Sequence, residues 1–91
     1  MLVMVVSTYD AKDAREVVKR FTAWPGPPQG AKIVGAWFDM TTCKAWFLHE
    51  VTDVKDHSRA AFDWLDLLTM EHHIVETPEE TMAITKEKGW W

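Results

Sequence analysis

Two apolar segments, 32–39 and 44–51, stand on either side of a four-residue loop, and their pairing is the strongest constraint on the fold. A loop of this length places Asp39 opposite Lys44, an opposite-charge pair at the end of a β-hairpin. Elsewhere the register sets small residues against large ones, except where two tryptophans meet. The pairs are Trp37–Trp46, Gly35–Leu48, Ala36–Phe47 and Phe38–Ala45.

The predicted hairpin has two different faces, because side chains alternate along a strand. One face suits the layer beneath the helices and carries Val34, Ala36, Phe38, Ala45, Phe47 and Val51. The other carries Ile33, Gly35, Trp37, Trp46 and Leu48, with Asp39, Lys44 and Glu50 at its ends. A tryptophan-rich face in water is typical of an interface. We therefore expect two copies to pack sheet to sheet as a homodimer that encloses a barrel-like space.

The segments before the hairpin predict a strand and a helix. The segment 2–7 carries Leu, Val and Met without alternation and turns polar at Ser7, the pattern of a strand covered on both faces. Asp10 can cap a helix that runs to about Thr22, because apolar residues recur there at helical spacing. These are Ala14, Val17, Val18 and Phe21. The Pro- and Gly-rich segment 24–30 predicts a loop that ends this helix.

After the hairpin, Thr52 or Asp53 can cap a second helix that runs to about Leu68. Its predicted buried stripe consists of Ala61, Trp64, Leu65 and Leu68. A short strand over 71–76 follows, and Pro78 opens a final helical segment through Met82 and Ile84. The order predicts an α+β, ferredoxin-like βαββαβ domain with a C-terminal helix. We expect one domain over 1–91, with 85–91 as a flexible tail.

Composition narrows the class of protein. With 47% apolar residues, a chain of 91 residues has more apolar surface than so small a body easily hides, which also favours a homodimer. The net charge of -4, without a basic cluster, argues against a nucleic-acid partner. The single cysteine, Cys43, fits a reducing compartment. The apolar start is too short for a signal peptide or a membrane span, so we expect a cytoplasmic protein without membrane contact.

Two segments carry a family resemblance: Ala-Trp-Phe-Leu-His-Glu-Val-Thr-Asp over 45–53 and Trp-Leu-Asp-Leu-Leu-Thr-Met-Glu over 64–71. They resemble a family of small bacterial and archaeal domains of unknown function, number 3303, in the dimeric α/β-barrel, ferredoxin-like superfamily. That family typically shows an aromatic-x-Leu-x-Glu strand, a Trp-x-Asp-Leu helix end and a strand that opens with an aromatic residue and Glu. The matching residues are Trp37, Trp46, Leu48, Glu50, Trp64, Asp66, Leu67, Met70 and Glu71.

The resemblance covers roughly residues 2–80 and implies a ferredoxin-like fold and a dimer, but no established activity. The wider superfamily includes cofactor-free monooxygenases, haem-degrading enzymes, isomerases and ligand-binding proteins, so fold alone does not assign a function. The chain departs from the pattern at His72, His73 and Ile74, where the family tends to show apolar residues and then proline. This departure leaves the register of the last strand open.

The histidines are candidates for a polar site. Adjacent strand residues point to opposite faces, so His72 and His73 cannot both serve one site. His49 and one of this pair can approach a common ligand, because the third and fourth strands of a ferredoxin-like sheet flank the first. The register puts His49 on the helix-facing side, where a buried neutral histidine is the alternative. No metal-binding spacing exists, so we expect no metal and no cofactor.

Carboxylates supply further candidates. Glu50 shares the tryptophan face and Glu71 starts the last strand, so desolvation beside an aromatic wall would make either a general base. The alternative is a salt bridge at the rim of the sheet. Asp66, near a helix C-terminus, needs a specific partner, and a backbone group or an arginine such as Arg59 or Arg20 is expected to supply it rather than a substrate.

The favoured function is binding of a small apolar or aromatic molecule beside the sheet face away from the helices, with Trp37, Trp46, Glu50 and Tyr9 as contacts. One alternative is a cofactor-free monooxygenase or isomerase in which Glu50, His72 or His73 transfers protons. Another is a structural or regulatory interaction protein without a ligand, in which the tryptophans only pack. Whether the chain is an enzyme stays open at this stage.

Overall fold

Four antiparallel strands form one sheet in the order β2-β3-β1-β4, and the computed structural model describes residues 1–27 and 30–91. The elements are β1 (Leu2–Thr8), the 3-10 helix η1 (Ala11–Asp13), α1 (Ala14–Ala23), β2 (Ala31–Asp39), β3 (Lys44–Val51), α2 (Val54–Phe62), β4 (Thr69–Val75) and α3 (Pro78–Glu87). This confirms the predicted ferredoxin-like order with a C-terminal helix. Of the predicted loop over 24–30, residues 28–29 lie outside the described part.

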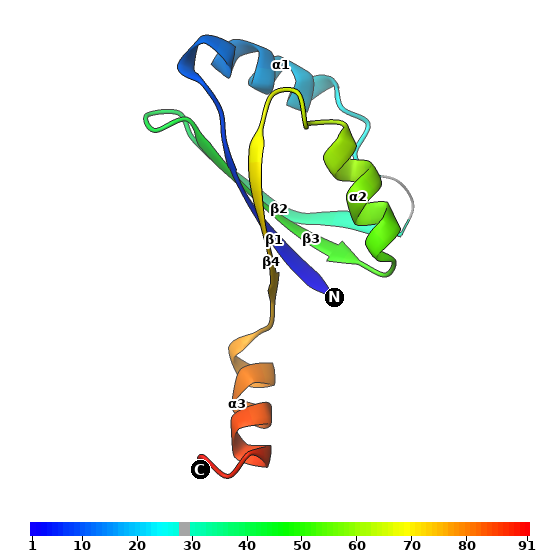
Figure 1. Cartoon of the computed structure of the whole chain (residues 1–91), viewed down its shortest axis with the longest axis vertical. Helices are drawn as coiled ribbons and strands as arrows, with labels where there is room; N and C mark the ends of the chain where they lie inside the picture. Colours follow the sequence, from blue (N-terminus) through cyan, green and yellow to red (C-terminus); the bar gives the residue numbers. More distant parts are fainter. Residues whose placement is uncertain (28–29) are drawn as a thin grey trace.

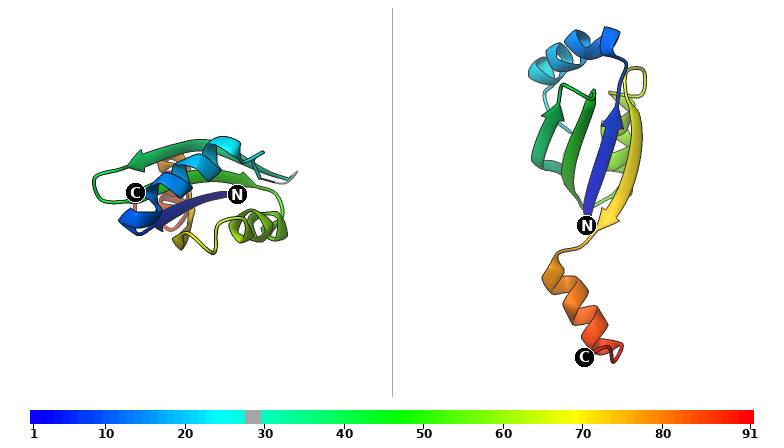
Figure 2. Two further views of the ribbon diagram at one scale, coloured as in Figure 1. Left: turned by 90° about the horizontal axis from the view of Figure 1, so that it is seen from above. Right: turned by 90° about the vertical axis from the view of Figure 1, so that its left-hand side faces the viewer.

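The helices divide the two sides of the sheet. Helices α1 and α2 lie on one side, whereas α3 projects beyond the end of the sheet (Figure 1). No helix of the described residues covers the opposite side of the sheet, which Figure 2, right, shows. We call this uncovered side the open face. No helix in the described residues has the length and apolar character needed to cross a bilayer.

The hairpin has the predicted register from Gly35–Leu48 to Asp39–Lys44. Asp39 fixes its loop: the carboxylate accepts hydrogen bonds from the backbone N–H of Thr41 at 3.0 Å and from the Thr42 hydroxyl at 2.7 Å. These bonds, with those from the Thr41 side chain, lower the pKa of Asp39 to about 2. Asp39 therefore accepts in its charged form at neutral pH and holds the turn closed.

For the residues that precede Gly35 the predicted alternation of side chains is wrong, because β2 contains a bulge between Ile33 and Gly35. In a bulge, two residues of one strand lie opposite one residue of its partner. The side chains that precede the bulge therefore point to the side opposite to the one that strict alternation predicts. Ile33 therefore pairs with His49 and faces the helices, although the sequence placed it on the other side. Val34, predicted beneath the helices, is exposed at the bulge.

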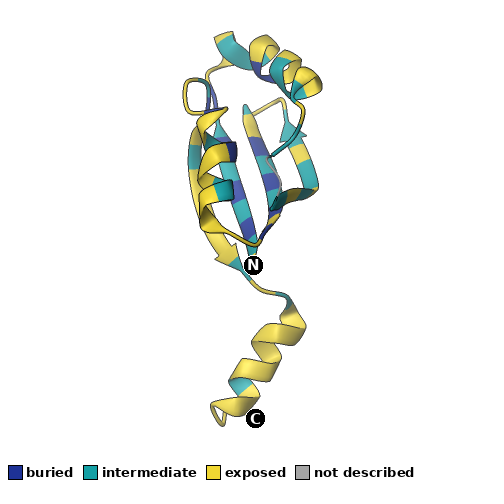
Figure 3. Ribbon diagram, turned by 90° about the vertical axis from the view of Figure 1, so that its right-hand side faces the viewer, coloured by how far each residue is buried: buried dark blue, intermediate teal, exposed yellow. Residues whose placement is uncertain are grey.

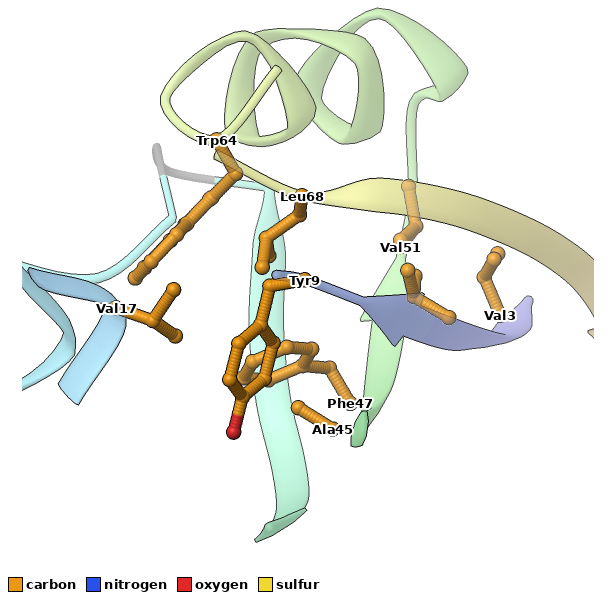
Figure 4. Close-up of a cluster of buried hydrophobic side chains, with 9 residues drawn as sticks. Val3, Tyr9, Val17, Ala45, Phe47, Val51, Trp64 and Leu68 are labelled. Atoms are coloured by element: carbon orange, nitrogen blue, oxygen red, sulfur yellow. The ribbon is translucent and has the colours of Figure 1, made fainter. Parts of the chain in front are cut away.

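The core lies between the sheet and the two helices. Every second residue of β3 is buried, and β1 buries Val3, Val5 and Ser7, while its other residues lie on the open face. The prediction that β1 is covered on both faces is therefore not met within one chain. Figures 3 and 4 show the buried positions. They include Val3, Tyr9, Val17, Ala45, Phe47, Val51, Trp64 and Leu68.

Helix α1 is tied to the segment after α2 by aromatic contacts and one ion pair. The Phe21 ring packs against Phe47 and Trp64, with ring centroids 5.8 and 6.5 Å away. The Arg20 guanidinium donates to both carboxylate oxygens of Asp66, at 2.6 and 2.9 Å. This confirms Arg20, one of the two predicted partners of Asp66, and the bidentate geometry fixes its orientation. The predicted cap Asp10, in contrast, makes no side-chain hydrogen bond to the helix.

Helix α2 begins as predicted, since the Asp53 carboxylate accepts from the Lys55 N–H at 2.9 Å. It ends at Phe62, earlier than the predicted end near Leu68, and turns continue the chain. The Leu68 N–H still donates to the Trp64 carbonyl at 2.9 Å, so both side chains point into the core. Leu65 does not share this stripe: it is 56% exposed, and its prediction as a core residue is wrong.

Two leucines after α2 offer a matched test of this packing. Leu68 is 5% exposed and Leu65 is 56% exposed. We expect Leu68→Ala to lower the free energy of unfolding by about 2–5 kcal/mol, because it leaves a cavity in the core. Leu65→Ala should change it by no more than about 0.5 kcal/mol. Urea denaturation followed by circular dichroism measures both, and equal losses would contradict the assignment.

Candidate functional site

The open face presents an apolar centre with polar borders. Strand pairing places its residues in two rows across the middle of the sheet. The rows are Trp37–Trp46–Val6–Glu71 and Gly35–Leu48–Met4–His73. Two polar residues on β4 therefore border an apolar surface built by β2, β3 and β1.

Trp37 is the most prominent side chain of this face, and Gly35 makes room for it. A Cβ added at Gly35 would lie only 2.5 Å from Cη2 of Trp37, so the indole ring lies over the glycine. Trp37 is nevertheless 54% exposed, whereas Trp46, its partner across the strands, is partly buried. The two rings thus form an aromatic surface, and none of the helices within residues 1–27 and 30–91 covers it.

Charged groups mark the edges of the open face. His73 Nε2 lies 3.1 Å from Glu71 Oε2, and both side chains project from β4 to this side. Glu50 lies one row beyond Leu48, with its carboxylate 4.0 Å from the Lys32 ammonium. Among the residues singled out from the sequence, Trp37, Trp46, Glu50 and His73 therefore share one face.

A second candidate site, the histidine cavity, lies between α2 and the sheet. It measures about 20 Å³, room for one water molecule. Its lining includes His49, His57, His72, Phe47 and Trp64. His57 Nε2 lies 2.8 Å from His72 Nδ1, and the His49 and His57 ring centroids are 5.4 Å apart.

His57 is the member of this cluster that sequence reasoning missed. It stands on α2 at helical spacing before Ala60, Ala61 and Trp64, so its position on the sheet-facing side was readable from the sequence. His72 lies on the same side, since it pairs with Val5, whereas His73 pairs with Met4 on the open face. The sheet thus brings His49 and His72 to one site and directs His73 away from it.

Desolvation lowers the pKa of all three imidazoles. Desolvation, with smaller effects of His57 and His72, lowers the pKa of His49 to about 4. Desolvation also lowers the pKa of His57 and of His72. His49 is 6% exposed, and its Nδ1 has no hydrogen-bond partner within the described residues. Nor do the described histidine, cysteine, aspartate and glutamate side chains form a group of three or more suited to a metal ion.

Tyr9 lies apart from the open face. It is buried in the core, and its hydroxyl donates to Met40 Sδ at 3.4 Å. Burial, and then the nearby Cys43 and Asp39, raise the pKa of Tyr9. The structure therefore does not bring Tyr9 together with Trp37 and Trp46.

Because the pKa of His49 in the histidine cavity is lowered, we expect acid to destabilise the fold. An unfolded histidine has a pKa near 6.5, so between about pH 6.5 and 4 the unfolded chain binds more protons than the folded chain. The contribution of His49 to stability is therefore complete above pH 6.5 and lost as the pH falls towards 4, by on the order of 3 kcal/mol. Urea denaturation across this pH range measures the loss.

His49→Leu replaces the buried imidazole with an apolar side chain that does not titrate, so it should remove much of this pH dependence. His73→Gln, on the open face, is the matched control and should leave the dependence as in the unmodified protein. An unchanged slope in His49→Leu would show that other groups cause the acid sensitivity.

Comparison with known proteins adds one finding. The model of a family described only as a domain of unknown function, DUF3303, matches residues 1–89. Searches of curated proteins and of solved structures found no significant match. The family therefore covers nearly the whole chain, and the function has to be argued from the site.

Proposed function

The chain therefore belongs to the DUF3303 family, and we propose that it pairs with a second copy through the open face and binds a small apolar or aromatic molecule between the two sheets. The observation that carries this proposal is the exposed Trp37 ring, which lies over Gly35 beside an apolar surface that no helix covers. Exposed apolar patches of this kind mark interaction sites.

A second copy is the occupant that best suits the open face. Two identical sheets packed on this side would remove Trp37, Trp46, Leu48 and Met4 from water, and burial of apolar area contributes roughly 25 cal/mol per Å². The polar residues of the face stand at its borders, where they keep contact with water. A two-fold pair is also the commonest assembly of identical chains.

The space between the sheets suits a small ligand better than the histidine cavity does. The cavity of about 20 Å³ admits water but no organic molecule. Aromatic walls with a few polar groups at the mouth are the usual composition of a small-molecule site. In the pair, Trp37 and Trp46 supply such walls, and Glu50, Glu71 and His73 supply polar groups.

Pairing can be tested with one substitution on each side of the sheet. Trp46→Glu introduces a charge in the middle of the open face, so we expect the dimer dissociation constant to rise at least about 100-fold. Phe62→Glu changes an exposed apolar residue of α2 and should leave that constant unchanged. Sedimentation velocity measures both, with circular dichroism as the check on folding. A monomeric unmodified protein would contradict the proposal.

Ligand binding can be tested with a fluorescent aromatic probe, anilinonaphthalene sulfonate, and with native mass spectrometry of the purified protein. We expect the probe to bind the dimer, and Trp37→Ala to weaken that binding about 10-fold by removing one wall of the site. Leu65→Ala, an exposed apolar residue of the helix side, serves as the control. A dimer that binds no probe and carries no molecule would support the interaction protein without a ligand instead.

One observation favours a second candidate, an enzyme that transfers protons without a cofactor. A carboxylate 3.1 Å from an imidazole can orient the ring towards a substrate, which suits a general base. In this function Glu71 and His73 act on a molecule held by the tryptophans. His73→Gln separates the two functions, because it would abolish turnover in an enzyme but leave the affinity of a simple binding protein nearly unchanged.

A further inference from the structure

Helix α3 stands apart from the rest of the molecule. Within the described residues it packs against no strand and no other helix, and it extends beyond the end of the sheet (Figure 1). The radius of gyration is 15.3 Å, whereas a compact chain of this length has about 12 Å. The projecting helix accounts for this difference and leaves both its own surface and the open face uncovered.

A short, hydrogen-bonded connection joins α3 to β4. Only Glu76 and Thr77 separate the strand from the helix. The Thr77 hydroxyl accepts from the Glu80 N–H at 3.2 Å, and the Glu80 carboxylate accepts from the Thr77 N–H at 3.0 Å. In addition, the Thr81 hydroxyl donates to Glu76 at 2.8 Å. The capping box fixes the first turn of α3, and the bond from Thr81 to Glu76 ties that turn to the connection.

Apolar side chains line a groove on α3. Met82 is 52% exposed, and Trp91 folds back so that its Nε1 donates to the Thr85 hydroxyl at 2.8 Å. Met82, Ala83 and Trp91 line the groove, with Glu79 and Lys86 at its borders. A helix of ten residues is marginal in water, so α3 would be stabilised by a surface that packs against this groove.

The geometry points to α3 as an exchanged arm: in the pair of copies, each α3 packs its Met82–Trp91 groove against the other copy and closes the end of the space between the sheets. This inference rests on the proposed function, because it requires two copies joined at the open face. Within the described residues the arm makes no contact with its own sheet, and it extends beyond the end of the sheet, past the row that contains Leu2 and Val75. A second copy on that face therefore meets the arm as well.

The area available on the sheet supports the exchange. A four-stranded face about 19 Å wide and 25 Å long offers roughly 500 Å². A stable interface buries about 800 Å² per partner. A helix about 15 Å long and 10 Å wide adds roughly 150 Å² on itself and a similar area on the surface it covers. The sheet alone therefore falls short of this typical size, and the sheet together with the arm reaches it.

The arm can be tested in the full chain with Met82→Glu, which places a charge in the groove without touching the capping box. We expect the dimer dissociation constant to rise at least about 10-fold in sedimentation velocity. Phe62→Glu is again the matched control, because it makes the same change at an exposed apolar position of the helix side. An unchanged constant in Met82→Glu would overturn the inference.

A photocrosslinker in place of Met82 gives an independent readout. When unlabelled and nitrogen-15-labelled protein are mixed before irradiation, we expect crosslinked peptides that join one labelled and one unlabelled chain. Crosslinks confined to single chains, or none, would overturn the exchange. If Trp46→Glu dissociates the pair but Met82→Glu does not, the exchanged arm is contradicted and the proposed function stands. If the unmodified protein is monomeric, both are contradicted.

Discussion

The alternation of side chains along β3 is the constraint on which the rest of the structure depends. Its buried residues, Ala45, Phe47, His49 and Val51, form the floor on which α1 and α2 pack. Its other residues, Trp46, Leu48 and Glu50, build the open face. Because the strand lies between β2 and β1, a shift by one residue would exchange the two sets and destroy both the core and the candidate site.

Features with a local physical cause were predictable from the sequence. The hairpin register followed from loop length, charge pairing and the match of small with large residues, as at Gly35 and Leu48. The capping role of Asp53 followed from residue type before a helical pattern. The need of Asp66 for a partner followed from its place near a helix end, although only the tertiary fold could choose Arg20 over Arg59.

Features that depend on tertiary packing were missed. The bulge beside Gly35 breaks the strict alternation of β2, and nothing in the residue types signals it beyond the glycine itself. Helix α2 ends at Phe62, which turns Leu65 outward although it falls within the apolar pattern. His57 was overlooked because a polar residue in an apolar stripe reads as surface, whereas the neighbouring His49 and His72 make it part of one cluster.

The bulge beside Val34 also limits how the sheet can grow. It lies in β2, an edge strand, and a bulge twists the edge and interrupts the regular row of N–H and C=O groups that a further strand would need. The other edge, β4, carries the consecutive polar residues Glu71, His72 and His73, which are costly to bring against a like strand. Both edges of the sheet therefore disfavour the addition of a strand from another copy, whereas the open face carries no such obstacle.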